Sequence, residues 1–334
     1  MKKVKVGYVD FWKGFVPEEY IFHKILSRHY EVEITNRDPD FIICSTFGNQ
    51  YLKYVCPRLL FVGEAFCPDF NVYDYAIGFD RINFGDRYLR YPLSLVNKEI
   101  LELALHKHER PEEDFTRREK FCSFVVSSGG GVDDIRNWFF DKISEYKQVD
   151  SGGRFRNNLP DGQPVPDKKA FQEQYRFSLA FENTSFPGYT TEKILDAWAA
   201  GTIPIYYGDP GIIKDFNEKA MIVCRGRESL DEVLDKIKEL EENTEKYLET
   251  VRQPIITDQS EIKPMLQPDY LENFLIHIFD QEPQQAFRRN SKLTMWGQFY
   301  EYRIKKWDNI DHLPIIELMR KWKRKIFGLK IIVK

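Results

Sequence analysis

The chain has 334 residues, of which 42% are hydrophobic and 30% charged, and its formal net charge is −3. This composition is typical of a soluble protein with about two domains, and the weak net charge argues against a nucleic-acid partner. No run approaches the roughly 18 apolar residues of a membrane-spanning helix, and the N-terminus lacks the apolar core of a signal peptide.

The cysteine pattern favours a cytoplasmic protein. The five cysteines lie mostly within apolar runs and form no CxxC pair: Cys44, Cys56, Cys67, Cys122 and Cys224. An odd number of cysteines without metal-ligand spacing indicates reduced thiols rather than a disulfide framework.

The first third of the chain predicts an α/β domain. A helix is expected over residues 18–28. Short apolar runs predict buried strands at residues 4–9, 32–35, 41–45, 59–62 and 75–79. Buried strands separated by helices or loops favour a parallel sheet.

The same alternation restarts after residue 120. Residues 106–120 are dense in charge and contain a proline, which suggests a linker between domains. Helices are then expected at residues 133–146, 191–200 and 229–242, and strands at residues 121–127, 177–181, 203–207 and 221–224. Gly201 occupies the position of a helix stop.

The chain therefore predicts two Rossmann-like lobes with a cleft between them. The expected boundaries are 1–115 for the first lobe, 116–305 for the second and 306–334 for a basic tail. Ligands of such sheets bind beyond the carboxyl ends of the strands, where helix N-termini point.

Several short motifs have an ordinary explanation. The loop Ser127–Gly131 can cradle a phosphate or simply form a tight turn, and Asp134 at the third-glycine position argues against a dinucleotide fingerprint. The triplet Asp38-Pro39-Asp40 resembles a cation-binding DxD, but it precedes a strand and so lies at the wrong end for a ligand. No histidine or cysteine cluster predicts a metal site.

Two places are better candidates for chemistry. Glu64 follows the apolar run LLFVG at the carboxyl end of a strand, where it is either a solvated loop acid or a general base. In FENTSFPGYTTEKILDAW (181–198), Glu192 and Lys193 fall in the first turn of a helix. The helix dipole disfavours Lys193 there, so a bound diphosphate would explain it, while Glu192 suits ribose hydroxyls.

The stretch FENTSFPGYTTEKILDAWAAGTIPIYYGDP resembles the donor signature of the α-1,3-fucosyltransferases of glycosyltransferase family 10. Residues 63–93, IRNWFFDKIS and VDSGGRFRNN resemble the bacterial branch, so that the likeness extends over roughly residues 1–305. The resemblance implies a GT-B fold and inverting transfer from GDP-fucose to an N-acetyllactosamine- or lactose-type glycan, giving a Lewis x-like product.

The resemblance also implies roles for individual residues. Glu64 would be the general base, and Arg136 and Lys193 would neutralise the diphosphate. The nucleotide and sugar would be lined by Asn183, Tyr189 and Glu192, with Arg154 and Arg156 as weaker candidates near the same site. Two fixed cations stabilise a leaving diphosphate as a metal does elsewhere, so no cofactor or essential divalent ion is expected.

Three alternatives stay open: α-1,4 or dual α-1,3/1,4 regiospecificity, a nucleotide-sugar-binding protein without turnover, and an NAD-dependent oxidoreductase, which Asp134 disfavours.

The last residues predict a basic amphipathic helix. Residues 313–334 carry seven Lys or Arg and one Glu, a net of +6, with apolar residues at helical spacing. Such a helix is expected either to lie on an anionic membrane surface or to pack on the first lobe.

Overall fold

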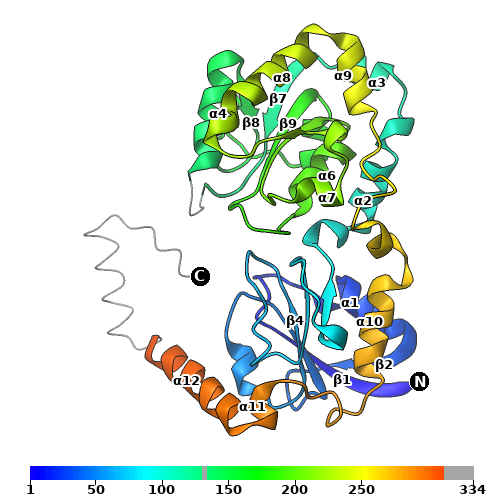
Figure 1. Cartoon of the computed structure of the whole chain (residues 1–334), viewed down its shortest axis with the longest axis vertical. Coiled ribbons are helices and arrows are strands. Elements are labelled where there is room, and N and C mark those ends of the chain that lie inside the picture. Colours follow the sequence, from blue (N-terminus) through cyan, green and yellow to red (C-terminus); the bar gives the residue numbers. More distant parts are fainter. Residues whose placement is uncertain (130–133, 312–334) are drawn as a thin grey trace. The chain divides into compact units, whose positions relative to one another are not determined.

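All five strands predicted before residue 80 are present in a computed structural model that describes residues 1–129 and 134–311. They belong to the first of two compact units, which comprises residues 1–78, 82–91 and the described residues from 268 onward. Its sheet is wholly parallel in the order β2-β1-β3-β4-β5-β6. Figure 1 labels the strands β1, β2 and β4 of this sheet. The strands are β1 (Lys2–Val9), β2 (Tyr30–Ile34), β3 (Phe41–Cys44), β4 (Arg58–Phe61), β5 (Tyr75–Gly78) and the unpredicted β6 (Tyr88–Arg90).

Four helices accompany this sheet. They are α1 (Ile21–His29), α10 (Asp269–Phe279), α11 (Asn290–Leu293) and α12 (Met295–Asp311). Helix α10 packs beside α1, and its Glu272 pairs with Arg28 at 2.9 Å. The last helices thus return to the unit formed by the start of the chain.

The second unit comprises residues 79–81 and 92–267 and has a five-stranded parallel sheet in the order β11-β10-β9-β7-β8. Its strands are β7 (Lys120–Phe124), β8 (Val149–Ser151), β9 (Tyr175–Phe181), β10 (Ile203–Tyr207) and β11 (Ile222–Val223). Its helices are α2 (Lys98–Leu105), α3 (Glu113–Thr116), α4 (Ile135–Tyr146), α5 (Lys168–Gln172), α6 (Glu192–Ala199), α7 (Ile212–Asp215), α8 (Leu230–Glu242) and α9 (Thr244–Val251). Gly201 ends α6 with φ +69°, as the helix-stop prediction requires.

The charged segment 106–120 is not a linker, so that prediction is wrong. Phe115 is buried in the core of the second unit, and the buried Lys107 Nζ donates to the carbonyl of Gln253 at 2.8 Å. Burial lowers the pKa of Lys107 to about 7. The chain passes between the units near residues 79–92 and 268.

A buried ionic network attaches the C-terminal helices to the first sheet. Asp74 accepts from the backbone N–H groups of Arg58, Arg288 and Arg289 at 2.7–2.9 Å and pairs with the Arg289 guanidinium. Arg58 in turn pairs with Glu301 of α12 at 2.8 Å. Burial of these charges is tolerated because each has a counter-ion.

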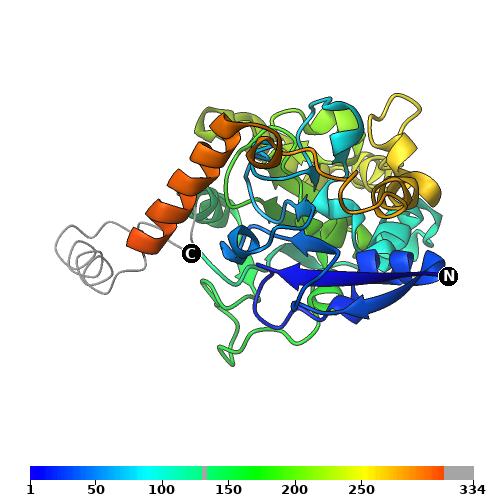
Figure 2. The ribbon, with the colours of Figure 1, turned by 90° about the horizontal axis from the view of Figure 1, so that it is seen from below.

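Helix α12 exposes several large apolar side chains. It carries Trp296, which is 81% exposed, together with Met295, Phe299, Tyr302 and Trp307. Figure 2 shows this helix, in orange, extending from its unit. The basic tail predicted for residues 306–334 lies outside the described residues from residue 312 onward. No helix among the described residues is both long and apolar enough to span a membrane.

Candidate active site

The joint between β9 and α6 is organised by a buried carboxylate. Glu182 directly follows β9, and its side chain is fully buried. Its Oε1 accepts from the backbone N–H of Thr191 at 2.7 Å, and the Thr191 hydroxyl lies 2.8 Å from both carboxylate oxygens. Thr191 is the N-cap of α6, so Glu182 fixes the start of this helix.

Glu182 also explains how Lys193 is tolerated near a helix N-terminus. The Lys193 ammonium donates to Glu182 Oε2 at 2.9 Å and to Thr191 Oγ1 at 2.8 Å. Burial would lower the pKa of Lys193, but the charges of Glu182 and Glu192 outweigh burial and raise it. The lysine therefore stays protonated, and its internal counter-ion was missed by the sequence analysis.

The third partner of the Lys193 ammonium is Glu192. Its side chain is exposed and lies 3.4 Å from Lys193 Nζ, the longest of the three contacts of the ammonium. Partial desolvation opposes ionisation of Glu192, but Lys193 and Lys168 outweigh it and lower its pKa to about 2. The longest contact of the Lys193 ammonium is thus the one to an exposed carboxylate, and its shorter contacts are to the buried Glu182 and to Thr191.

Arg136 supplies a second cation at the N-terminus of α4. Its side chain is 7% exposed, and Nη1 donates to the carbonyl of Ser128 at 2.9 Å. Its Nε and Nη2 are buried and have no hydrogen-bond partner among the described residues. Burial lowers the pKa of Arg136, against the raising effects of Glu182, Tyr189 and Glu192, so these groups share one electrostatic environment. Buried guanidinium N–H groups without a partner are costly unless an anion accepts from them.

Topology brings Arg136 and Lys193 together. Strands β7 and β9 are neighbours, and α4 and α6 begin beyond their carboxyl ends. Helix N-termini at this edge of a parallel sheet attract anions through their free N–H groups and dipoles. The structure thus places Arg136, Glu192 and Lys193 near one another, and their roles toward a diphosphate stay predictions. Of the phosphate loop Ser127–Gly131, the last two residues lie outside the described residues.

Asn183 and Tyr189 flank the same joint, on the loop between β9 and α6. Asn183 is half-buried and follows Glu182, while Tyr189 is buried with its ring 5.2 Å from that of Phe79. That these two residues line a nucleotide and its sugar stays a prediction.

The two weaker candidates, Arg154 and Arg156, differ in their exposure and in their partners. Arg154 is exposed in the loop after β8. Arg156 has φ +54°, pairs with Asp141 of α4 and places its guanidinium 4.4 Å from the Phe140 ring centroid. Arg156 is therefore already neutralised by a carboxylate, and phosphate contact by either arginine stays a prediction.

A second buried acid holds the other side of the loop, and the sequence analysis did not single it out. Asp209 follows β10 and accepts from the Gly188 N–H at 2.7 Å. Arg81 pairs with Asp209 at 2.7 Å and with Asp215 at 2.9 Å. Gly188 has φ +81°, and a Cβ there would lie 2.4 Å from the carbonyl oxygen of Phe79, so only glycine fits.

Glu64 belongs to the first unit and lies where the sequence predicted. It is half-buried in the bend that follows β4, at the carboxyl end of that strand. The preceding Gly63 packs tightly, since a Cβ there would lie 3.1 Å from Ser45 Oγ and from the Phe47 ring. Ser45 itself donates to the carbonyl of Phe61 at 3.0 Å. The backbone that carries Glu64 is therefore well supported.

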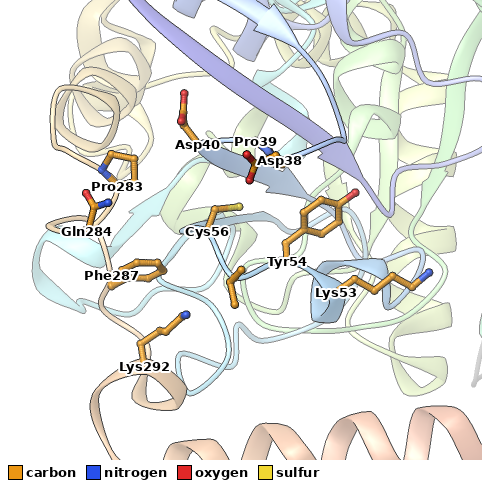
Figure 3. A pocket seen from close by; sticks show the side chains of 11 residues that line it. Asp38, Pro39, Asp40, Lys53, Tyr54, Cys56, Pro283, Gln284, Phe287 and Lys292 are labelled. Atoms are coloured by element: carbon orange, nitrogen blue, oxygen red, sulfur yellow. The ribbon is translucent and has the colours of Figure 1, made fainter.

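The Asp38-Pro39-Asp40 triplet lies at the opposite end of this sheet, as expected. It lines an open pocket of about 500 Å³ together with Lys53, Cys56, Phe287 and Lys292 (Figure 3). Asp40 Oδ2 accepts from the Lys5 backbone N–H at 2.8 Å, which ties the triplet to β1. Its structural role is thus to connect β1 and β3.

Comparison with known proteins places the chain in a family. Residues 6–97 match the alpha-(1,3)-fucosyltransferase FucT N-terminal domain, and residues 115–252 match the C-terminal model of glycosyltransferase family 10 (fucosyltransferase). The chain belongs to glycosyltransferase family 10.

Individual relatives agree with this assignment. The chain is 33% identical over 286 residues to the alpha-(1,3)-fucosyltransferase FucT of Helicobacter pylori. The alignment covers 74% of this chain and 59% of that protein. The chain thus spans about three fifths of the length of this relative.

Solved structures confirm the GT-B class of fold. A crystal structure of an alpha1,3-fucosyltransferase with GDP matches with a TM-score of 0.67 and 29% identity, over 82% of this chain and 90% of that chain. A crystal structure of an alpha1,3-fucosyltransferase with GDP-fucose matches with a TM-score of 0.66 and 29% identity, over 82% of this chain and 91% of that chain.

We expect Lys193→Ala and Arg136→Ala each to weaken the binding of a diphosphate ligand, probed with GDP, by roughly 1.5–3 kcal/mol, because each removes a charged donor from the edge of the sheet that attracts anions. Isothermal titration with GDP measures the effect, and Lys219→Ala, at an exposed position of the same unit, is the control. Lys193→Ala also leaves Glu182 without its counter-ion, so titration is done below the melting temperature of each variant. Unchanged dissociation constants for both variants would remove these cations from the phosphate site.

Proposed function

We propose that this protein is an inverting glycosyltransferase that moves L-fucose from GDP-fucose to a hydroxyl group of a glycan. The observation that carries the proposal is that two buried nitrogens of Arg136, Nε and Nη2, have no hydrogen-bond partner in the described part of the chain and share the electrostatic environment of the protonated Lys193. A diphosphate satisfies both, and the matched solved structures are alpha1,3-fucosyltransferases with GDP or GDP-fucose.

The proposed reaction is a single displacement. The acceptor oxygen bonds to C1 of fucose as the bond from C1 to the β-phosphate oxygen breaks, and the bonding pair leaves with GDP. The hydroxyl proton passes to the carboxylate of Glu64, which follows β4 of the first unit.

Arg136 and Lys193 stabilise the negative charge that develops on the departing diphosphate. Glu192, released from its 3.4 Å contact with Lys193, is then available to accept from sugar or ribose hydroxyls. Because two fixed cations serve the leaving group, we propose that no divalent ion is required.

The proposed acceptor is the 3-hydroxyl of N-acetylglucosamine or glucose in an N-acetyllactosamine or lactose unit, which gives a Lewis x-like product. Support comes from the family model and from the H. pylori relative, both named for α-1,3 transfer. The alternatives are α-1,4 or dual linkage, and a nucleotide-sugar-binding protein that does not turn over.

A product assay tests the proposal. Purified protein is incubated with GDP-fucose and N-acetyllactosamine in EDTA, and the product is identified by mass and by NMR of the new linkage. We expect an α-1,3-fucosylated trisaccharide. An α-1,4 product would correct the linkage, activity only after Mn²⁺ addition would overturn metal independence, and donor binding without any product would favour the non-catalytic binder.

Glu64→Gln is expected to reduce turnover by about 10²-fold or more, because the amide cannot take the acceptor proton. The affinity for GDP should stay unchanged, since phosphate contacts come from the second unit. Steady-state kinetics and GDP titration are compared with Glu99→Gln, a substitution at an exposed glutamate. An equal loss of turnover and of GDP affinity would refute the role as base.

We further propose that the protein contacts anionic lipid from the cytoplasmic side. Support comes from the exposed Trp296, Phe299 and Trp307 on α12, with Arg303 and Lys306 on the same helix, and from the basic sequence that follows. Exposed Trp beside Lys and Arg is typical of helices that lie in a membrane interface.

The double variant Trp296→Ser/Trp307→Ser is expected to bind phosphatidylglycerol vesicles more weakly than the wild type, while Ile213→Ser, on the second unit, leaves binding unchanged. Co-sedimentation with anionic and with neutral vesicles measures this. Equal binding of the double variant and the wild type would refute a contact through α12.

A further inference from the structure

An aromatic cluster covers one edge of the first sheet, beside Glu64. The loop after β1 contributes Phe11, Trp12 and Phe15, and the loop after β3 contributes Phe47. Phe11 and Phe15 stack with their centroids 3.8 Å apart, and the Trp12 ring meets Phe15 edge-on at 5.1 Å and Phe47 at 6.1 Å. These four side chains are called the aromatic platform below.

The platform shares the carboxyl edge of the sheet with Glu64. Strands β1, β3 and β4 are consecutive neighbours, and their following loops carry Trp12, Phe47 and Glu64. Direct packing joins them, since a Cβ on Gly63 would lie 3.1 Å from the Phe47 ring. Phe66, two residues beyond Glu64, is also exposed.

The loop that carries Trp12 is held by its base. Asp10 has φ +60°, and its buried carboxylate accepts from the backbone N–H groups of Gln50 at 2.9 Å and Tyr51 at 2.8 Å. Its carbonyl accepts from the Phe47 N–H at 3.0 Å. A left-handed aspartate is uncommon and persists only where its surroundings hold it, so the two loops are fixed together.

Trp12 is nevertheless 39% exposed, although aromatic residues deeper in the cluster are covered. Phe22 and Phe61 are buried, and Tyr20 packs between them and Phe15 at 5.1 Å. The rings of Phe22 and Phe61 fill the core, whereas the partly exposed indole of Trp12 contributes little buried apolar surface to it. A rigid aromatic face beside an acid is suited to a ligand with one apolar side and many hydroxyls.

We propose that the aromatic platform, with Trp12 as its principal contact, stacks against a pyranose ring of the acceptor glycan. The inference rests on the proposed function, because it assigns the acceptor subsite of that reaction. One face of a pyranose presents only C–H groups, whose partial positive charge matches the negative face of an indole. Stacking on Trp12 leaves the hydroxyls of the next sugar free to reach Glu64, which follows β4, two strands along the sheet from β1.

Direct saccharide binding tests this independently of turnover. The whole protein with saturating GDP is titrated with N-acetyllactosamine by saturation-transfer NMR. Trp12→Ala should raise the dissociation constant for the disaccharide roughly tenfold, the equivalent of losing one good contact. The dissociation constant of Trp12→Phe for the disaccharide should lie between those of the wild type and Trp12→Ala. The affinity of these variants for GDP should not change. Trp296→Ala, at a more exposed tryptophan distant in sequence, should bind as the wild type does.

Each other outcome is decisive. Equal disaccharide binding by the wild type and Trp12→Ala, or no binding by the wild type, would overturn the inference. A changed oligomeric state of Trp12→Ala with unchanged disaccharide binding would also overturn it and show that the platform contacts protein. Disaccharide binding that depends on Trp12 without fucosylated product would leave the inference standing and refute the proposed function alone.

Discussion

The arrangement of the candidate donor site depends on the buried carboxylate of Glu182. Removed from water, this charge must be compensated by hydrogen bonds and a counter-ion. It accepts from Thr191, which fixes where α6 begins, and from Lys193, which fixes the direction of the ammonium. A lysine near a helix N-terminus is unfavourable by itself, so the acid below it makes the cation of the site possible.

The acids that follow strands in this protein fall into two groups that differ in burial. Asp10, Glu182 and Asp209 are buried and accept from backbone N–H groups of neighbouring loops. Glu64 follows β4 and Glu192 is the first residue of α6, and both are at least partly exposed. The first group holds loops in place, and the second has the access to solvent that a group acting on a ligand needs.

A similar division applies to the cations of the second unit. Arg81 makes ion pairs with Asp209 and Asp215 and thereby holds the Pro187–Gly188 turn. Arg136, by contrast, has one hydrogen bond to the Ser128 carbonyl and two nitrogens without a described partner. Guanidinium groups in full ion-pair geometry stabilise the fold, whereas an incompletely bonded, buried guanidinium is a signal of ligand binding.

The sequence by itself determined the fold class and the places of the candidate site residues along the chain, whose roles stay predictions. Buried strands are continuous apolar runs, and the carboxyl end of a parallel strand follows from chain direction alone, which suffices to locate Glu64, Lys193 and, through the family resemblance, Arg136. It did not reveal that the charged segment 106–120 packs into the second unit, or that α10–α12 return to the first. Only the tertiary structure decided those points, and likewise the roles of Glu182, Asp209 and Arg81. The physical reason is that whether a charge faces water or a counter-ion depends on residues distant in sequence, as Arg81 and Asp209 are from each other, and no local pattern encodes such a pairing.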